Sequence, residues 1–289
     1  MTATDLAPRK DHKQENFPVA SFIIKPRHRA AIMAFYRFAR MADDVADHPT
    51  LAAPERLAQL EKMRATLAGE NDADAVSLAL RQALDERSLS PEHGLDLLVA
   101  FRQDVAKNRY ANWDELIDYC RHSAMPVGRF VLDVHGEART TWPANDALCA
   151  ALQAVNHLQD CAKDYRELDR VYLANDLMAA AGTSVEALSA PEASPALRSV
   201  IVEMARRTQV LLDTSRPLAS QIRDRRLAYE VALIQRLAED LTARLIARDP
   251  LSERVHHRPL EVLGLVILAG KDQIAGRRRT TVKLAGRAE

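Results

Sequence analysis

Apolar residues recur at the three- and four-residue spacing of an α-helix along almost the whole chain, and no segment alternates convincingly with the period of two that marks a half-buried strand. Only nine of the 289 residues are glycine, so few positions favour a break. We expect helices over residues 27–46, 53–69, 74–86, 91–108, 113–135, 145–166, 194–214, 217–247 and 259–277. The pattern predicts an all-α protein.

The helical patterns form one continuous series. The one long irregular stretch, within residues 169–194, contains AGTSVEALSAPEASP, whose Gly, Pro and Ser residues are typical of a surface loop. Helices of the same composition are expected on both sides, so the loop is not read as a domain boundary. We predict a flexible N-terminus over residues 1–16, one domain over 17–277 and a basic tail over 278–289.

Charge and hydropathy exclude several functions. Forty basic and forty acidic residues cancel, and the basic run GRRRTTVK at 276–283 lacks interleaved aromatic residues, so no nucleic-acid binding is expected. The longest apolar run, VLGLVILAG at 262–270, is too short to span a bilayer, and the N-terminus has no signal-like apolar core. Cys120, Cys149 and Cys161 lie in apolar helical contexts and are expected to be buried thiols. A cytoplasmic protein is predicted.

Three aspartates lie near the end of the first expected helix, in RFARMADDVADHPT at 37–50. Asp43 and Asp47 are one turn apart on one face, with Asp44 beside them, and their like charges repel. The negative end of the helix dipole disfavours them further. An arrangement so unfavourable for stability suggests a bound cation, and Mg²⁺ fits because it binds one or two carboxylates together with phosphate oxygens.

The same spacing recurs at Asp160 and Asp164, on a helical stripe that also contains Gln153 and Asn156. Such spacing also arises by chance: a third pair, Asp114 and Asp118, lies at an expected helix start, where the dipole favours carboxylates. A polar stripe within Ala, Leu and Val faces either solvent or a wet cavity, and the residues alone do not decide between the two.

Three blocks resemble, in order and spacing, the squalene and phytoene synthase family of head-to-head isoprenoid synthases: ENFPVASFIIKPRHRAAIMAFYRFARMADDVAD, YCRHSAMPVGRFVLDVHG and ALQAVNHLQDCAKDYRELDRVYLANDL. The likeness extends over residues 15–177, with a weaker tail to residue 269. The first block is most like the bacterial branch that makes hydroxysqualene for hopanoid synthesis. The resemblance implies one helical bundle around a central cavity, with two aspartate-bearing helices facing each other.

The resemblance also implies roles for individual residues. Tyr119 would lie near the reacting carbons and act together with the four aspartates. The implied Mg²⁺ ligands are Asp43, Asp47, Asn156, Asp160 and Asp164. The implied contacts to a polyprenyl diphosphate substrate are Ser21, Phe22, Tyr36, Arg40, Gln153, Asn156 and Arg258.

Several functions compete. The first block favours ionisation of presqualene diphosphate and capture of the cation by water, which gives hydroxysqualene. Condensation of two farnesyl diphosphates, or NADPH-dependent formation of squalene, is the alternative within the family. Leu245 and Ile246, in TARLIARD, stand where family members often carry a tyrosine. This difference argues against a condensing mechanism identical to theirs. A non-catalytic scaffold is disfavoured because all implied metal ligands remain. The apolar C30 product implies peripheral contact with the inner membrane face, and contact with other enzymes of the squalene pathway remains open.

Overall fold

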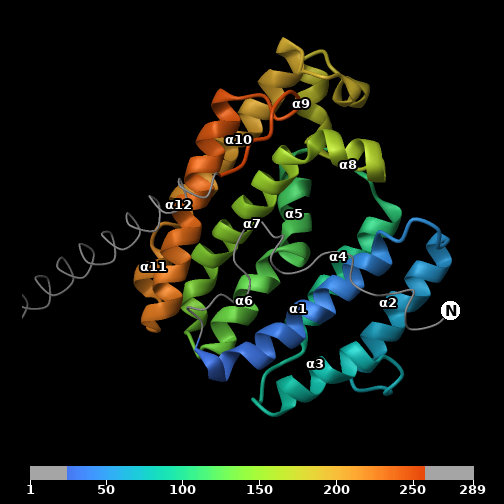
Figure 1. Ribbon diagram of the computed structural model, residues 1–289, viewed down its shortest axis with the longest axis vertical. Helices are drawn as coiled ribbons and strands as arrows, with labels where there is room; N and C mark the ends of the chain where they lie inside the picture. Colours follow the sequence, from blue (N-terminus) through green and yellow to red (C-terminus); the bar gives the residue numbers. More distant parts are fainter. Residues whose placement is uncertain (1–24, 258–289) are drawn as a thin grey trace, which may run out of the picture.

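The computed structural model describes residues 25–257 and is almost entirely helical (Figure 1). The elements in chain order are α1 (Pro26–Ala46), α2 (Ala53–Leu67), α3 (Ala75–Asp85), α4 (Glu92–Ala106), β1 (Arg109–Tyr110), α5 (Trp113–Ser123), α6 (Met125–Val134), η3 (Arg139–Thr141), α7 (Trp142–Gln159), α8 (Cys161–Leu168), β2 (Val171–Ala174), α9 (Asn175–Ala180), η4 (Val185–Ser189), α10 (Pro195–Ser215), α11 (Leu218–Gln221) and α12 (Arg225–Ala247). The all-α prediction is confirmed. The predicted domain limits and the helix expected over 259–277 lie outside the described residues.

Local sequence explains where several helices begin. The side chains of Asp74, Asn112, Ser194 and Asp224 each accept a hydrogen bond from a backbone N–H in the first turn of the helix that follows. These bonds satisfy donors that have no partner within the helix. Asp114 lies in the first turn of α5, where the helix dipole favours its charge, as predicted.

Three of the helices predicted as continuous are divided, so the predictions over 113–135, 145–166 and 217–247 are wrong at one point each. Pro126 lies in the first turn of α6, where its ring and its missing N–H prevent continuation from α5. Asp224 caps α12 and separates it from α11. The break at Asp160, between α7 and α8, has neither proline nor glycine to announce it.

A short parallel ladder joins β1 to β2, although no strand was expected. Its register pairs Arg109 with Val171 and Tyr110 with Ala174, with an irregularity between the two positions. Strands of two and four residues are too short to show a period of two, which explains why the sequence pattern missed them. The ladder connects the segment after α4 with the segment after α8.

Two large groups of buried apolar residues hold the helices together. One lies among α1, α2, α3 and α4 and includes Phe38, Leu60 and Leu98. The other lies among α5, α7, α10, α12 and the ladder and includes Leu158 and Ile201. In Figure 1 the C-terminal end of α1 points towards α8, so the two predicted aspartate regions lie on the same side of the molecule.

Gly128 sets how closely α6 packs against α7. A Cβ atom at this position would lie 2.1 Å from Asn145 Oδ1 and 2.6 Å from Cys149 Sγ. We expect Gly128→Ala to lower the free energy of unfolding by about 2 kcal/mol, because this overlap outweighs alanine's better helix propensity. Urea unfolding measures the change, with Val127→Ala, at a half-exposed neighbour, as the control. Equal or greater stability of Gly128→Ala would show that α6 can move away from α7 at little cost.

Candidate active site

The first aspartate pair lies at the C-terminal end of α1, as predicted: Asp43 is in the last turn, and Asp47 is the C-cap residue that follows Ala46. Arg40, one turn earlier, contacts two carboxylates of the same helix: its Nη1 lies 2.6 Å from Asp43 Oδ2 and its Nη2 lies 3.0 Å from Asp44 Oδ1. The Arg40 side chain is 15% exposed, whereas that of Asp43 remains 37% exposed. Arg40 therefore places a positive charge within the aspartate cluster, where a phosphate contact was predicted, and Asp43 stays accessible to a ligand.

The second pair lies at the junction of α7 and α8. Asp160 ends α7, and Asp164 lies in the first turn of α8. The Asp160 N–H donates to the Asn156 carbonyl at 3.0 Å, and the Asp164 N–H donates to the Asp160 carbonyl at 2.8 Å. Because these bonds continue the four-residue spacing through the break, Asn156, Asp160 and Asp164 still follow one another at intervals of about one turn.

Arg170 contacts both aspartate regions, and the sequence analysis did not single it out. Its backbone N–H donates to the Asp164 carbonyl at 3.1 Å. Its Nη2 donates to Asp47 Oδ1 at 2.8 Å and to the Asp104 carbonyl at 3.2 Å. The Arg170 side chain is only 8% exposed. The sole sequence signal is that Arg170 belongs to the third block, immediately before the apolar residues of β2. A buried arginine beside carboxylates indicates a polar site with a function, because burying these charges is costly.

The aspartates repel one another strongly. Burial and then the charge of Asp47 raise the pKa of Asp43 to about 6. Burial and then the charge of Asp160 raise the pKa of Asp164 to about 7, and Asp47, from the other helix, contributes to the same increase. The two pairs therefore lie close enough to interact. Carboxylates held together against their own repulsion are a suitable environment for a hard divalent cation.

The three-residue groups with converging metal-ligand atoms lie elsewhere in the described part of the chain. One contains His28, His135 and Asp224, and the other contains Glu92, His93 and Asp133, with ligand atoms within 4.8 Å of one another. The predicted Mg²⁺ ligands form no such group among residues 25–257. A Mg²⁺ ion at the aspartates would therefore take one or two carboxylates and complete its shell with water or phosphate oxygens, which is its usual preference.

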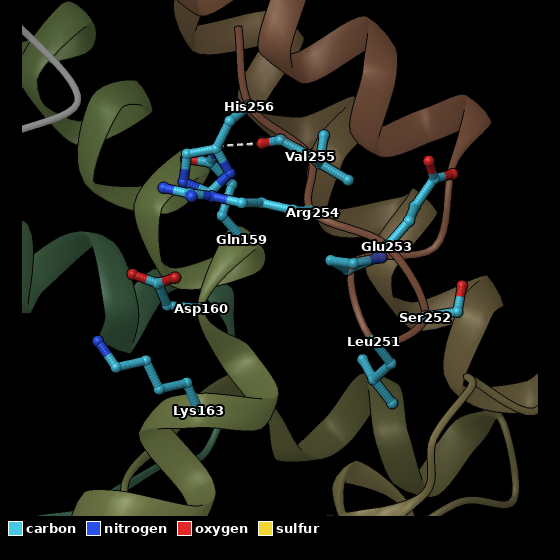
Figure 2. A pocket seen from close by; sticks show the side chains of 10 residues that line it. Gln159, Asp160, Lys163, Leu251, Ser252, Glu253, Arg254, Val255 and His256 are labelled. Carbon is cyan, nitrogen blue, oxygen red and sulfur yellow. Dashed lines mark hydrogen bonds between the residues drawn. The ribbon is translucent and has the colours of Figure 1, made fainter. Parts of the chain in front are cut away.

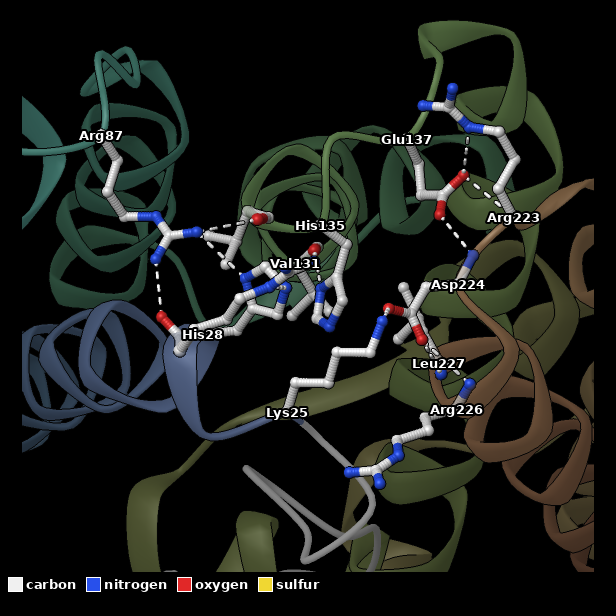
Figure 3. A network of polar contacts seen from close by, with 12 residues as sticks. Lys25, His28, Arg87, Val131, His135, Glu137, Arg223, Asp224, Arg226 and Leu227 are labelled. Atoms are coloured by element: carbon white, nitrogen blue, oxygen red, sulfur yellow. Dashed lines mark hydrogen bonds and ion pairs between the residues drawn. The ribbon is translucent and has the colours of Figure 1, made fainter.

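Asp224, the acidic member of the His28 group, is engaged in structural contacts (Figure 3). Lys25 Nζ lies 2.7 Å from Asp224 Oδ2, and Asp224 also caps α12. The Glu137 carboxylate accepts hydrogen bonds from the backbone N–H groups of Arg223 and Asp224, both at 2.9 Å. These contacts fix the start of α12 against the segments that begin α1 and follow α6.

Tyr119 lies in a cluster of rings beside the aspartates. Its hydroxyl donates to Asp104 Oδ2 at 2.8 Å. The centroid of its ring lies 5.4 Å from that of Tyr110 and 6.0 Å from that of Tyr172. Arg170 Nη1 lies 3.4 Å from the Tyr172 hydroxyl, so this aromatic cluster and the aspartate site share one guanidinium group.

Gln153 reaches the same cluster through a histidine that the sequence analysis missed. Gln153 Nε2 lies 3.0 Å from His157 Nε2, and the His157 ring stacks on Tyr172 with centroids 3.3 Å apart. Burial lowers the pKa of His157 to about 3, so the ring is neutral at physiological pH. One pattern could have marked His157: it follows Gln153 by four residues and therefore lies one turn further along α7.

A polar hollow of ≈ 420 Å³ opens beside Asp160. It lies between the α7–α8 junction and the chain segment 250–256, and Figure 2 shows Asp160, Lys163 and Arg254 around it. The Gln159 side chain, which is buried, donates a hydrogen bond to the Val255 carbonyl and holds this segment against α7. Asp160 of the second aspartate pair is thus accessible to a polar ligand.

The remaining predicted residues have mixed outcomes. Tyr36 lies on α1, one turn before Arg40, and is partly buried. Ser21, Phe22 and Arg258 lie outside the described residues. Phe35, on α1, was not among the predicted residues. It stacks on Phe130 of α6 with ring centroids 4.0 Å apart in an apolar core, so it is a packing residue.

The chain belongs to the squalene/phytoene synthase family, whose family model matches residues 10–261. It is 55% identical over 258 residues to a hydroxysqualene synthase of Sinorhizobium fredii, a match that covers 89% of this chain and 88% of that protein. A hydroxysqualene synthase of Zymomonas mobilis is 53% identical over 276 residues, which are 95% and 93% of the two chains. The family resemblance predicted from three sequence blocks is confirmed.

Solved structures agree with this assignment. A squalene synthase of Alicyclobacillus acidocaldarius superposes with a TM-score of 0.72 at 30% identity, covering 81% of this chain and 89% of that one. A dehydrosqualene synthase superposes with a TM-score of 0.75 over 91% and 93% of the two chains, and at 20% identity this likeness concerns the fold alone. Among residues 25–257, no helix is both long and apolar enough to cross a bilayer.

Proposed function

We propose that the protein converts presqualene diphosphate to hydroxysqualene with the help of Mg²⁺. The observation that carries the proposal is the meeting of the two aspartate pairs around Arg170, next to the ring cluster of Tyr119. The similarity to hydroxysqualene synthases over most of both chains supports the choice of reaction.

The proposed residues have different roles in the ionisation of the substrate. Asp43, Asp47, Asn156, Asp160 and Asp164 would hold Mg²⁺, which, when bound, neutralises diphosphate and improves it as a leaving group. Arg40 provides a further positive charge at the end of α1 that faces the second pair. Arg170 keeps Asp47 turned towards the site through its 2.8 Å contact. Ser21, Phe22, Tyr36 and Arg258 complete the proposed substrate contacts.

The rings protect and stabilise the carbocation that ionisation leaves. Tyr110, Tyr119 and Tyr172 are almost completely buried, which limits random access of water. Aromatic faces attract positive charge, and we assign this role to Tyr119, since the Tyr172 ring is stacked on His157 and Tyr110. The neutral His157 ring and the Gln153 amide, 3.0 Å apart, are polar groups at the edge of this cluster and suit the orientation of one water molecule.

A product assay tests the proposed reaction. Purified protein receives presqualene diphosphate in one tube and farnesyl diphosphate in another, each with Mg²⁺ and each with and without NADPH. Mass spectrometry identifies the C30 products. Hydroxysqualene from presqualene diphosphate without NADPH is the expected result. Consumption of farnesyl diphosphate would assign the condensing reaction instead, and no turnover in any tube would favour a scaffold of the same fold.

Metal binding and pH should be coupled in the stability of the protein. The raised pKa values of Asp43 and Asp164 mean that the folded state holds protons that the unfolded state releases. The free energy of unfolding of the metal-free protein should therefore fall as the pH rises from about 4 to about 7. Mg²⁺ should reverse this loss, because it replaces the protons between the carboxylates.

Thermal unfolding with and without Mg²⁺ measures the coupling. We expect Mg²⁺ to raise Tm by about 4 °C near pH 8 and by much less near pH 5, where the carboxyl groups are protonated. Asp114→Asn, at the third aspartate pair, is the control and should leave the response unchanged. An equal response at both pH values would contradict binding at the two aspartate pairs.

The product also suggests where the protein works. Hydroxysqualene is an apolar C30 alcohol, so we propose that it leaves into lipid at the inner face of the membrane and passes to a later enzyme of the squalene pathway. Peripheral contact is sufficient for this release, and sedimentation of the protein with lipid vesicles after turnover would test it.

A further inference from the structure

Asp104, on α4, is the closest acidic partner of Tyr119. The Tyr119 hydroxyl donates to Asp104 Oδ2 at 2.8 Å, and the tyrosine lies on α5, a different helix. Asp104 Oδ1 is buried and has no hydrogen-bond partner within the described part of the chain. A buried carboxylate with one oxygen unpaired is costly for stability, which suggests a use beyond packing.

The direction of this hydrogen bond determines what Tyr119 offers to a substrate. An ionised carboxylate can only accept, so the single hydroxyl proton of Tyr119 points at Asp104. The lone pairs of the phenolic oxygen then remain available on its other side. Tyr119 is thereby fixed as a hydrogen-bond acceptor towards the reacting groups, which is the orientation needed to receive a proton from water.

Within the described residues, the groups around Asp104 do not form an ion pair that neutralises its carboxylate. Arg170 is the nearest cation, yet it donates to the Asp104 backbone carbonyl at 3.2 Å and pairs its charge with Asp47. Asp43 and Asp47, on α1, add negative charge, and Tyr110 and Tyr172, from the ladder, add buried hydroxyl groups nearby.

We infer that the Asp104 carboxylate accepts, through the Tyr119 hydroxyl, the proton released when water adds to the substrate cation. This inference rests on the proposed function. A lone pair of the water oxygen forms the new C–O bond, one water proton moves to the Tyr119 oxygen, and the Tyr119 proton moves to Asp104 Oδ2. The electron pair of the broken C–O bond leaves with diphosphate, so the products are the alcohol, diphosphate and one proton on Asp104.

The electrostatic environment suits this exchange. Burial raises the pKa of Asp104 to about 7, and the charge of Arg170 partly opposes the increase. A carboxyl group in this range takes up a proton and returns it to solvent near neutral pH with little energy difference. Asp104 acts through Tyr119 and is a positioning residue, whereas Tyr119 is the group that meets the substrate.

The test compares Asp104→Asn with the unchanged protein at saturating Mg²⁺ and presqualene diphosphate. Asparagine keeps the shape and an oxygen that accepts the Tyr119 hydrogen bond, but it cannot take up the proton. We expect kcat to fall about a hundredfold with KM nearly unchanged. The rise of kcat with pH through about 7 should be present in the unchanged protein and absent from Asp104→Asn and Tyr119→Phe. Asp118→Asn, at an exposed position next to Tyr119, is the control.

Separate outcomes overturn separate claims. If the unchanged protein makes no hydroxysqualene, the proposed function fails, and the role of Asp104 fails with it. If it makes hydroxysqualene and Asp104→Asn keeps the same rate and pH profile, only the role of Asp104 fails. Should Asp104→Asn not fold, the profile of the unchanged protein still decides: a flat kcat across neutral pH overturns the inference, and a rise that disappears in Tyr119→Phe supports it.

Discussion

Replacing Asp164, a proposed metal ligand, with asparagine is expected to lower kcat with presqualene diphosphate about a thousandfold, because loss of such a ligand removes several kcal/mol of stabilisation from the leaving diphosphate. The same change should stabilise the metal-free protein. The pKa of Asp164 is raised to about 7, so its ionisation at alkaline pH lowers the free energy of unfolding. Asparagine carries no charge and avoids this loss.

The two readouts have opposite signs, which separates loss of function from loss of structure. kcat is measured at saturating substrate and Mg²⁺, and Tm is measured without metal near pH 8. Glu167→Gln, at an exposed position of α8, serves as the control and should change neither value. An Asp164→Asn protein that keeps its activity would remove Asp164 from the metal site.

Replacing Arg170 with methionine should produce the largest loss of stability, about 4 kcal/mol in the free energy of unfolding near neutral pH. The guanidinium group is buried, and its removal leaves Asp47 without its 2.8 Å partner. It also leaves Asp104, Asp43 and Asp164 without the positive charge that lowers their pKa values. Uncompensated carboxylates in a buried site are costly because they have lost water and gained no partner.

The loss should depend on pH in a defined direction. Without Arg170 the pKa values of Asp104 and Asp164 rise further, so the folded state binds protons more tightly than before. The difference between the variant and the unchanged protein should therefore be greatest near pH 8 and should shrink as the pH falls below about 6. Urea unfolding at the two pH values measures it, with Arg166→Met, at an exposed position of α8, as the control. A difference that does not vary with pH would contradict this electrostatic explanation.

Local features of the site were predictable from the sequence, whereas its long-range contacts were not. The extent of α1 follows from helical spacing, and repulsion between Asp43 and Asp47 correctly indicated a special environment at its end. The bond from Arg170 to Asp47 joins residues 123 positions apart. The bond from Tyr119 to Asp104 crosses between helices. Neither contact can be predicted from the periodicity of the sequence, because each depends on how complete helices pack.

The aromatic residues illustrate the same limit. Phe35 and Tyr119 both occupy buried helical positions, and spacing alone treats them alike. Their neighbours in the structure differ: Phe35 stacks on Phe130 in an apolar core, whereas Tyr119 donates a hydrogen bond to a carboxylate. The polar atom of a buried tyrosine needs a partner, so the identity of that partner decides between packing and chemistry.

The ladder between β1 and β2 has a consequence for how the chain can change in length. The Val171 N–H donates to the Asn108 carbonyl at 2.9 Å, which fixes the segment after Asp104 against the segment after Arg170. One residue inserted between Arg170 and Val171 would shift Arg170 by one position relative to the ladder and turn its guanidinium group away from Asp47. The loop that connects α9 to α10 carries none of these groups. Insertions and deletions among related sequences should therefore gather in that loop and spare the spacing from Asp104 through the ladder to Tyr119, which makes this spacing a practical marker for recognising proteins that share the pair of Asp104 and Tyr119.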